Sequence, residues 1–389
     1  MSARHYQGPA FLSYGFRPFF LFAGLSAAFL VPAWLYLFTH GGGLPGGIDP
    51  LRWHIHEMLF GYLAAVITGF LLTAIPNWTG RLPISGRPLL MLALVWLLGR
   101  MAMLAPIMPE TAAVVDSVFL IAVAGLAARE VMAGKNWRNL PVCLIVGLLA
   151  AANIVFHLES LSVFGGDYAV RASIGLVVML NALIGGRIVP SFTTNWLIKN
   201  SRSERPVPFG EFDKLLLLAT AAALLAWIVR PESEVVAAVL MAIGGGHLLR
   251  LYRWRGWATT SSAIVLVLHV AYLWIPVGLG LLGLDAIMQG ALTQSAGIHA
   301  LTAGLMGLMP LAVMSRATLG HTGRDLRVGT FGGVMYSAIF LGAFLRVMAV
   351  FMPEAYMSFL SAAGFLWCLG FLMFTVRYGA MLLAPRVGA

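Results

Sequence analysis

Residues 53–76, WHIHEMLFGYLAAVITGFLLTAIP, decide the fold, because they join two histidines and a carboxylate to a long apolar run. No charged residue lies between Met58 and Pro76, and a membrane-spanning helix needs about 20 mostly apolar residues. Ionisable groups in a span cost free energy, about 2.5–3.5 kcal/mol for a charge at the centre. Histidines kept at that cost commonly bind a metal ion or a haem.

The composition of the whole chain indicates many such spans. Of its 389 residues, 60% are hydrophobic and only 10% are charged, and the mean hydropathy is +0.88. A soluble domain is about 25% charged. The sequence therefore predicts an all-α polytopic membrane protein in contact with the lipid bilayer, with one transmembrane domain over residues 1–389.

Twelve apolar runs are long enough to be transmembrane helices. Their length and their Leu, Ala and Gly content favour helices over barrel strands, in which apolar residues alternate with polar ones. The predicted helices cover residues 18–39, 53–75, 88–106, 111–132, 139–159, 169–190, 213–230, 234–251, 259–282, 290–314, 329–351 and 355–377.

The basic residues predict the orientation of these helices. With twelve spans, 20 of the 25 Lys and Arg residues fall on the side that holds both termini. The positive-inside rule then places both termini in the cytoplasm. Because the basic residues lie in short loops between apolar runs, the net charge of +10 reflects this rule and does not indicate binding of nucleic acid.

A weak internal repeat is visible in the chain. Pro76, Pro190 and Pro310 each end a Gly-containing apolar run, and they are 114 and 120 residues apart, or four predicted spans each time. This spacing predicts a three-fold repeat of four-helix units. The alternative is that Pro and Gly are common near the ends of membrane helices.

Six histidines fall within the predicted spans and are the candidate ligands of a metal or haem: His54, His56, His157, His247, His269 and His299. A rise of about 1.5 Å per helical residue places the first three near the outer surface. His247 and His269 come out about 20 Å deep, and His299 lies between the two tiers. For each of them the alternative is a hydrogen-bonded structural role.

The two tiers predict two sites. His54, His56 and His157 form the outer metal site, with Glu57 as a ligand, a hydrogen-bond partner of an imidazole, or a proton acceptor. On a regular helix His54 and His56 point about 200° apart, so one ion would not take both. His247 and His269 are the predicted haem ligands, and His299 could join either site.

Other features of these spans have two readings each. Glycines beside the histidines suit a flat porphyrin, and equally suit close helix packing. Imidazole ligands suit haem iron, copper and zinc alike. Arg17, Arg187 and Arg316, at the cytoplasmic ends of their spans, are candidate partners for haem propionates, against the simpler readings of an interfacial anchor and the positive-inside bias.

The motifs around these residues resemble those of the NnrS family, over nearly the whole chain. The stretches that carry the resemblance are Phe16-Arg-Pro-Phe-Phe20, Trp53-His-Ile-His-Glu-Met58 with Thr73-Ala-Ile-Pro-Asn-Trp-Thr-Gly80, Gly186-Arg-Ile-Val-Pro190, His247-Leu-Leu-Arg250, His269-Val-Ala-Tyr-Leu-Trp274, and His299-Ala-Leu-Thr-Ala-Gly304 running to Arg316 and Leu319-Gly-His-Thr-Gly-Arg324.

The resemblance implies a multi-pass protein of the bacterial inner membrane that contains haem b and copper. It implies a role in nitric oxide metabolism and nitrosative stress, often alongside denitrification. Nitric oxide, or another small diatomic molecule, and an electron donor would be its partners. The resemblance does not say which histidine binds which metal.

Two classes of function stay open on the sequence. In the first, the protein binds or processes nitric oxide, or moves electrons, at a His-ligated haem, and would then be a haem-dependent oxidoreductase. In the second, it transports a metal or a small solute along a path lined by the intramembrane histidines.

Overall fold

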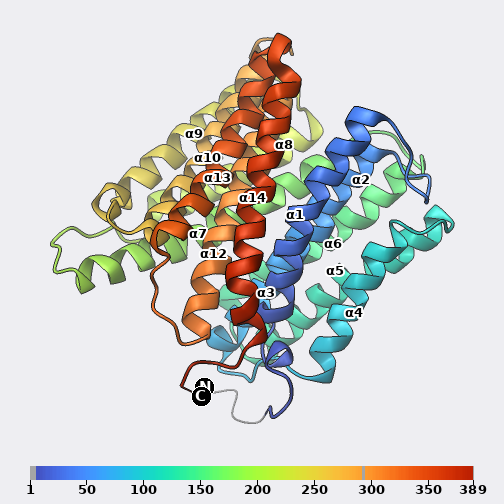
Figure 1. Ribbon diagram of the computed structural model, residues 1–389. Helices are drawn as coiled ribbons and strands as arrows, with labels where there is room; N and C mark the ends of the chain where they lie inside the picture. The colour runs from blue at the N-terminus through green and yellow to red at the C-terminus, as the bar shows by residue number, and fades with distance from the viewer. Residues whose placement is uncertain (1–5, 291–293, 389) are drawn as a thin grey trace. The chain divides into compact units, whose positions relative to one another are not determined.

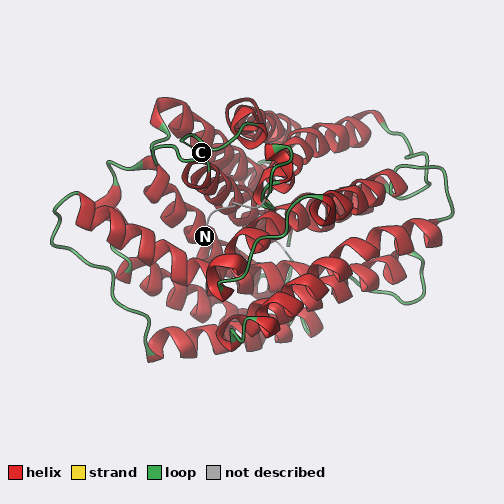
Figure 2. Ribbon diagram, turned by 90° about the horizontal axis from the view of Figure 1, so that it is seen from below, coloured by secondary structure: helices red, strands yellow, loops and turns green. Residues whose placement is uncertain are grey.

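The computed structural model describes residues 6–290 and 294–388, and this part of the chain forms helices and loops with no strand (Figure 1; Figure 2). Helices lie at all twelve predicted transmembrane spans, several of them longer than predicted, and residues 291–293 of the predicted span 290–314 lie outside the described residues. Eleven of the helices that the structure describes are long and apolar enough to cross a membrane. The other, α4, has only 16 residues. The all-α, polytopic fold is therefore confirmed.

Two of the twelve crossings consist of an α-helix, a short π-helical segment and a second α-helix. The first crosses as α2, a π-helical segment at Glu57–Tyr62, and α3; the second as α11, a π-helical segment at Ala300–Leu305, and α12. The helices are α1 (Phe16–His40), α2 (Pro50–His56), α3 (Leu63–Thr79), α4 (Arg87–Ala102), α5 (Pro109–Ala133), α6 (Leu140–Ser160), α7 (Tyr168–Lys199), α8 (Glu211–Val229), α9 (Glu234–Arg253), α10 (Ala263–Ile287), α11 (Ser295–His299), α12 (Met306–His321), α13 (Gly329–Met348) and α14 (Tyr356–Leu383).

Local sequence explains where the crossing that carries His56 begins and ends. The carboxylate of Asp49 accepts a hydrogen bond from the backbone N–H of Arg52 at 2.9 Å, and Pro50 occupies the first helical turn, where its missing N–H costs nothing. At the other end, Gly80 adopts φ +71°, and its N–H donates to the carbonyl of Pro76 at 2.9 Å. A glycine in this left-handed conformation is a common end of a helix.

The contacts divide the chain into two compact units. Unit 1 comprises Met1–Ser173, Met314–Asp325 and Phe371–Ala389, and unit 2 comprises Ile174–Val313 and Leu326–Gly370. Three separate four-helix groups do not emerge from these contacts, so the three-fold repeat stays a prediction. The single transmembrane domain over residues 1–389 also stays a prediction.

In unit 1 the start of α1 lies against the end of α14. The Arg17 guanidinium donates from Nη1 to the carbonyls of Leu382 at 2.9 Å and Ala384 at 2.6 Å. These are carbonyls at the end of a helix, which lack partners within it. The start of α1 and the end of α14 are thus at one end of this unit, as an even number of membrane crossings requires. The cytoplasmic location of that end stays a prediction.

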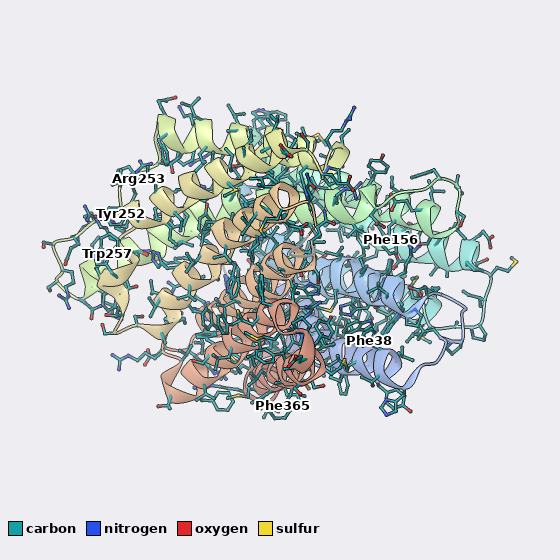
Figure 3. The ribbon with its side chains drawn as sticks, turned by 90° about the horizontal axis from the view of Figure 1, so that it is seen from above. Phe38, Phe156, Tyr252, Arg253, Trp257 and Phe365 are labelled. Carbon is teal, nitrogen blue, oxygen red and sulfur yellow. The ribbon has the colours of Figure 1, made fainter. Side chains whose placement is uncertain are left out.

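Large apolar side chains face outward on many helices. Phe38 of α1 and Phe365 of α14, both labelled in Figure 3, are 51% and 66% exposed. In water such faces would cost free energy, whereas lipid chains cover them without penalty. Near the end of α9, Tyr252 and Trp257 pair with their ring centroids 4.7 Å apart, and aromatic pairs of this kind suit the membrane–water interface. The chain is a multi-pass membrane protein.

Candidate metal centre

The π-helical segment at Glu57–Tyr62 follows directly on His56, in unit 1. A π-helical turn inside an α-helix is rare and often marks a functional site. Gly61 lies in this segment, and a Cβ atom there would come within 2.7 Å of Arg100 Nη1 and 2.9 Å of Glu57 Oε2. Glycine at this position therefore lets the guanidinium of α4 reach the carboxylate.

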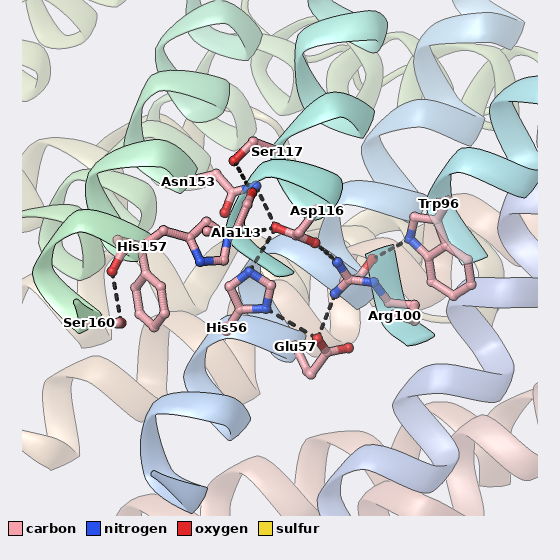
Figure 4. A network of polar contacts seen from close by, with 12 residues as sticks. His56, Glu57, Trp96, Arg100, Ala113, Asp116, Ser117, Asn153, His157 and Ser160 are labelled. Atoms are coloured by element: carbon pink, nitrogen blue, oxygen red, sulfur yellow. Dashed lines mark hydrogen bonds and ion pairs between the residues drawn. The ribbon is translucent and has the colours of Figure 1, made fainter. Parts of the chain in front are cut away.

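Three side chains from three helices converge beside this segment (Figure 4). His56 Nε2 of α2 lies 3.0 Å from Asp116 Oδ2 of α5, and His157 Nε2 of α6 lies 2.9 Å from the same oxygen. All three residues are buried, with exposed fractions of 0%, 1% and 6% in the order His56, Asp116, His157. One ligand atom from each lies within 4.8 Å of the others, a spacing at which they could hold one metal ion.

Glu57, Arg100 and Asn153 surround these three side chains. The Arg100 guanidinium donates from Nη1 to Glu57 Oε1 at 2.7 Å and from Nη2 to Asp116 Oδ1. The Asn153 amide donates to Asp116 Oδ2 at 2.9 Å. Asn153 and His157 are four residues apart on α6, so one helix face presents both.

The hydrogen-bonding groups around His56 call for a cation. Its Nδ1 lies 3.1 Å from Glu57 Oε1 and its Nε2 3.0 Å from Asp116 Oδ2, and ionised carboxylates only accept. A neutral imidazole has one N–H, which leaves one of its lone pairs facing a carboxylate oxygen. Two carboxylates and one guanidinium also sum to −2 + 1 = −1. A proton or a metal ion between Nε2 and Asp116 removes both conflicts.

This arrangement has the donor set and the second hydrogen bond that a metal site requires. In metal sites a ligating histidine commonly donates its second ring N–H to a carboxylate, which fixes the tautomer and the ring orientation. Glu57 is such a carboxylate for His56, because its Oε1 lies 3.1 Å from His56 Nδ1. His56 Nε2, His157 Nε2 and an Asp116 oxygen would then be the metal ligands, a nitrogen and oxygen set that suits copper(II), zinc or iron.

The structure separates the predicted outer histidines. His56 and His157 meet at Asp116, as the prediction of an outer site requires. His54 points elsewhere: its ring stacks on Trp34 of α1, with the centroids 4.5 Å apart. The expected divergence of His54 and His56 is confirmed, because the two side chains contact different helices.

Sequence reasoning did not identify Asp116, Asn153 and Arg100 as members of the site. A signal for Asp116 was present, because it is the one acidic residue within the apolar run from residue 111 to 128. An intramembrane acid is a functional-site candidate with a partner to be found. The i, i+4 spacing of Asn153 and His157 was a second signal.

His247, a predicted haem ligand, lies in unit 2 with both ring nitrogens in hydrogen bonds. Thr220 Oγ1 donates to the carbonyl of Leu216 at 2.6 Å, so it accepts from His247 Nε2–H at 3.0 Å. Tyr272 accepts from Arg250 Nη1 at 3.1 Å and donates to His247 Nδ1 at 2.8 Å. His247 is 0% exposed, so in this packing it has neither a nitrogen nor an open face for haem iron.

His269, the other predicted haem ligand, has one ring nitrogen in a hydrogen bond. Thr193 Oγ1 donates to the carbonyl of Val189, so His269 Nε2–H donates to Thr193 at 2.8 Å. Its Nδ1 is buried and has no hydrogen-bond partner among the described residues. The backbone of Gly256 covers that side, since a Cβ there would lie 2.6 Å from Nδ1. A porphyrin does not fit into this contact.

The glycines beside the histidines pack against neighbouring side chains. A Cβ at Gly246 would lie 2.6 Å from Leu216, one at Gly297 would lie 2.7 Å from Leu282, and one at Gly304 would collide with the ring of Trp274. Close helix packing therefore explains these three glycines in this structure. A haem at His247 or His269 stays a prediction that this packing does not accommodate.

The remaining predicted residues are His299, Arg17, Arg187 and Arg316. His299 is the last residue of α11, directly before the second π-helical segment in unit 2, and its Nδ1–H donates to the carbonyl of Ser295 at 2.8 Å. Arg17 caps α14, which is a structural role. Arg187 of α7 and Arg316 of α12 are half-buried, and their role toward propionates stays a prediction.

The fold and the cluster define a polytopic helical membrane protein with a buried His–Asp–His site. A family model described as NnrS protein matches residues 10–386. The chain belongs to this family, and its membership gives it a role in the response to nitric oxide. No curated protein matches the chain.

Proposed function

We propose that this protein binds a transition metal ion, copper in particular, between His56, Asp116 and His157, and uses it in the nitric oxide response. The convergence of the three ligand atoms within 4.8 Å carries the proposal. The NnrS resemblance favours copper over zinc and iron. A bound copper ion would supply one-electron chemistry toward nitric oxide or an electron donor.

The residues of the chain have separate roles in this proposal. The two imidazoles and the Asp116 carboxylate hold the ion. Glu57 accepts from His56 Nδ1–H and so keeps the lone pair of Nε2 turned toward the ion. Arg100 pairs with both carboxylates, which offsets the cost of burying two negative charges. The burial of the three ligands and of Glu57 excludes water from the ion.

Haem b is left as a prediction, because neither His247 nor His269 accommodates a porphyrin in this packing. An enzymatic activity, a bacterial inner-membrane location and the identity of an electron donor are likewise proposals that follow from the resemblance. The His–Asp–His cluster is also where the alternative function, transport of a metal ion, would bind its cargo.

Metal analysis of the purified full-length protein tests the proposal. We expect about one copper ion per chain, with nitrogen hyperfine structure from two imidazoles in its EPR spectrum. Both should be lost in His56→Gln and His157→Gln and kept in His54→Gln, the matched control two residues from His56. An unchanged copper content in His56→Gln and His157→Gln would contradict the proposal. Copper that crosses proteoliposome membranes with turnover would support transport instead.

A further inference from the structure

A buried arginine without a carboxylate partner among the described residues lies in unit 2, in the last turn of α13. Arg346 is 9% exposed, and its Nη2 donates to Ser295 Oγ of α11 at 3.1 Å. Its Nη1 is buried and has no hydrogen-bond partner in the part of the chain that the structure describes. No ion pair joins Arg346 to a carboxylate within residues 6–290 and 294–388.

The hydroxyl of Ser295 is a second donor without an acceptor. His299 Nδ1 lies 2.8 Å from the Ser295 carbonyl, which only accepts, so Nδ1 carries the hydrogen. The Ser295 hydroxyl oxygen lies 3.2 Å from that N–H and 3.1 Å from Arg346 Nη2, and it therefore accepts. Its own proton has no acceptor among the described residues. Two unused donors, Ser295 Oγ–H and Arg346 Nη1–H, thus lie side by side.

A buried guanidinium with unused donors needs an explanation. Burial of an unpaired charge costs several kcal/mol even after relaxation. Water could satisfy the two donors but would leave the charge uncompensated. A ligand that only accepts hydrogen bonds and carries a negative charge satisfies both requirements.

We propose that Arg346 and Ser295 form a binding site for a monovalent oxyanion. One negative charge balances the one guanidinium, and two oxygens in one plane match the donors of an arginine. The π-helical segment Ala300–Leu305, which follows His299, is a second sign of function at this place. The site shares no residue with the metal cluster and does not depend on the proposed metal.

The same oxyanion chemistry has two sources. One is a small soluble anion such as nitrate. The other is the phosphodiester of an anionic phospholipid, because Arg346 is two residues from the end of α13, where a membrane helix meets the headgroups.

Thermal unfolding of the full-length protein in detergent distinguishes these sources. One arm compares sodium nitrate with sodium chloride at equal ionic strength. The other compares micelles that contain phosphatidylglycerol with micelles that contain phosphatidylcholine. We expect one of the two anions to raise the unfolding midpoint in a saturable way, as binding to the folded state requires. The arm that responds identifies the source.

Variants test whether these side chains form the site. Arg346→Gln should abolish the anion-dependent shift, and Ser295→Ala, which leaves the guanidinium in place, should weaken binding about tenfold. Arg346→Leu should be at least as stable as the wild type without the anion, because it removes an unpaired buried charge. Arg230→Gln, which removes an exposed arginine at the end of α8, is the matched control and should bind normally.

The proposal is overturned if neither nitrate nor phosphatidylglycerol differs from its control in the wild type. It is also overturned if Arg230→Gln and Arg346→Gln reduce the shift equally, or if Ser295→Ala binds as the wild type does.

Discussion

Each unit buries a polar network built around histidine, and the two networks differ in the partners of the imidazoles. In unit 1, His56 faces Glu57 and Asp116, whose carboxylate oxygens only accept. In unit 2, His247 faces the hydroxyls of Thr220 and Tyr272, each of which can accept or donate as required. The first network needs an additional cation, whereas the second is complete with its own hydrogens.

The comparison extends to the charges. Asp213 pairs with Arg250 at 2.8 Å and with Arg253 at 3.4 Å, so the carboxylate of unit 2 has two guanidinium partners. Arg100 of unit 1 instead serves two carboxylates, Glu57 and Asp116. Burial does not distinguish His56 from His247, since both are 0% exposed. The chemistry of the partners does, and it supports the metal site that we propose in unit 1.

Neutralisation of the central carboxylate in each network should give the largest effects. Asp116→Asn and Asp213→Asn each leave a guanidinium without a full partner, the part-buried Arg100 and the buried Arg250, so each should lower the free energy of unfolding by about 3–5 kcal/mol. Only Asp116→Asn should also lower metal affinity, by at least about 100-fold, because it alone removes a ligand. Denaturant titration and metal analysis of both variants measure the two quantities. Metal loss in Asp213→Asn would remove the distinction between the units.

Substitution of the second partner of each histidine should have an intermediate effect. Glu57→Gln keeps the three ligands but loses the carboxylate that orients His56, and metal affinity should fall by about 10–100-fold. Tyr272→Phe removes the hydrogen bond to His247 Nδ1 and should cost about 1–3 kcal/mol of stability, with metal affinity unchanged. Competition with a chelator of known affinity measures the first effect. Wild-type affinity in Glu57→Gln would show that this carboxylate does not support the site.

A pair of glycine substitutions tests the packing beside the histidine of each unit. A Cβ at Gly61 would press on Arg100 and Glu57, so Gly61→Ala should destabilise the protein by about 1–3 kcal/mol and weaken metal binding. Nothing lies within 4 Å of a Cβ at Gly245, so Gly245→Ala should be neutral or stabilising by up to about 1 kcal/mol. Thermal unfolding of both proteins tests this. A marked loss of bound haem in Gly245→Ala would support the prediction of a porphyrin site beside His247.

Apolar run length and charge placement were sufficient to predict the helices, because a membrane span needs little besides about 20 apolar residues. The sequence was also sufficient to predict that His54 and His56 diverge, since helix geometry is fixed. It was not sufficient to predict the two π-helical segments, which have no simple composition signal. α4 is shorter than the predicted range of 88–106. It ends at Ala102, because Pro106 has no N–H to donate to the carbonyl of Ala102 and its ring would clash there.

The sequence predicted only part of the site, and the reason is physical. Helical periodicity says which residues of one helix share a face, but not which faces of different helices meet. His56 and His157 were candidates because histidine is rare and costly in a membrane. Asp116 and Arg100 reach the same point through the packing of α4 and α5 on the crossing that carries His56, which one sequence does not reveal. The sequence likewise did not reveal that the hydroxyls of Thr220 and Tyr272 are the hydrogen-bond partners of His247.

An anomalous difference map from crystals of the copper-loaded protein tests the central claim most directly. The account predicts one strong peak in unit 1, within about 2.0–2.2 Å of His56 Nε2, His157 Nε2 and an Asp116 oxygen. A map without a peak there, or with its copper peak at His247, would contradict it.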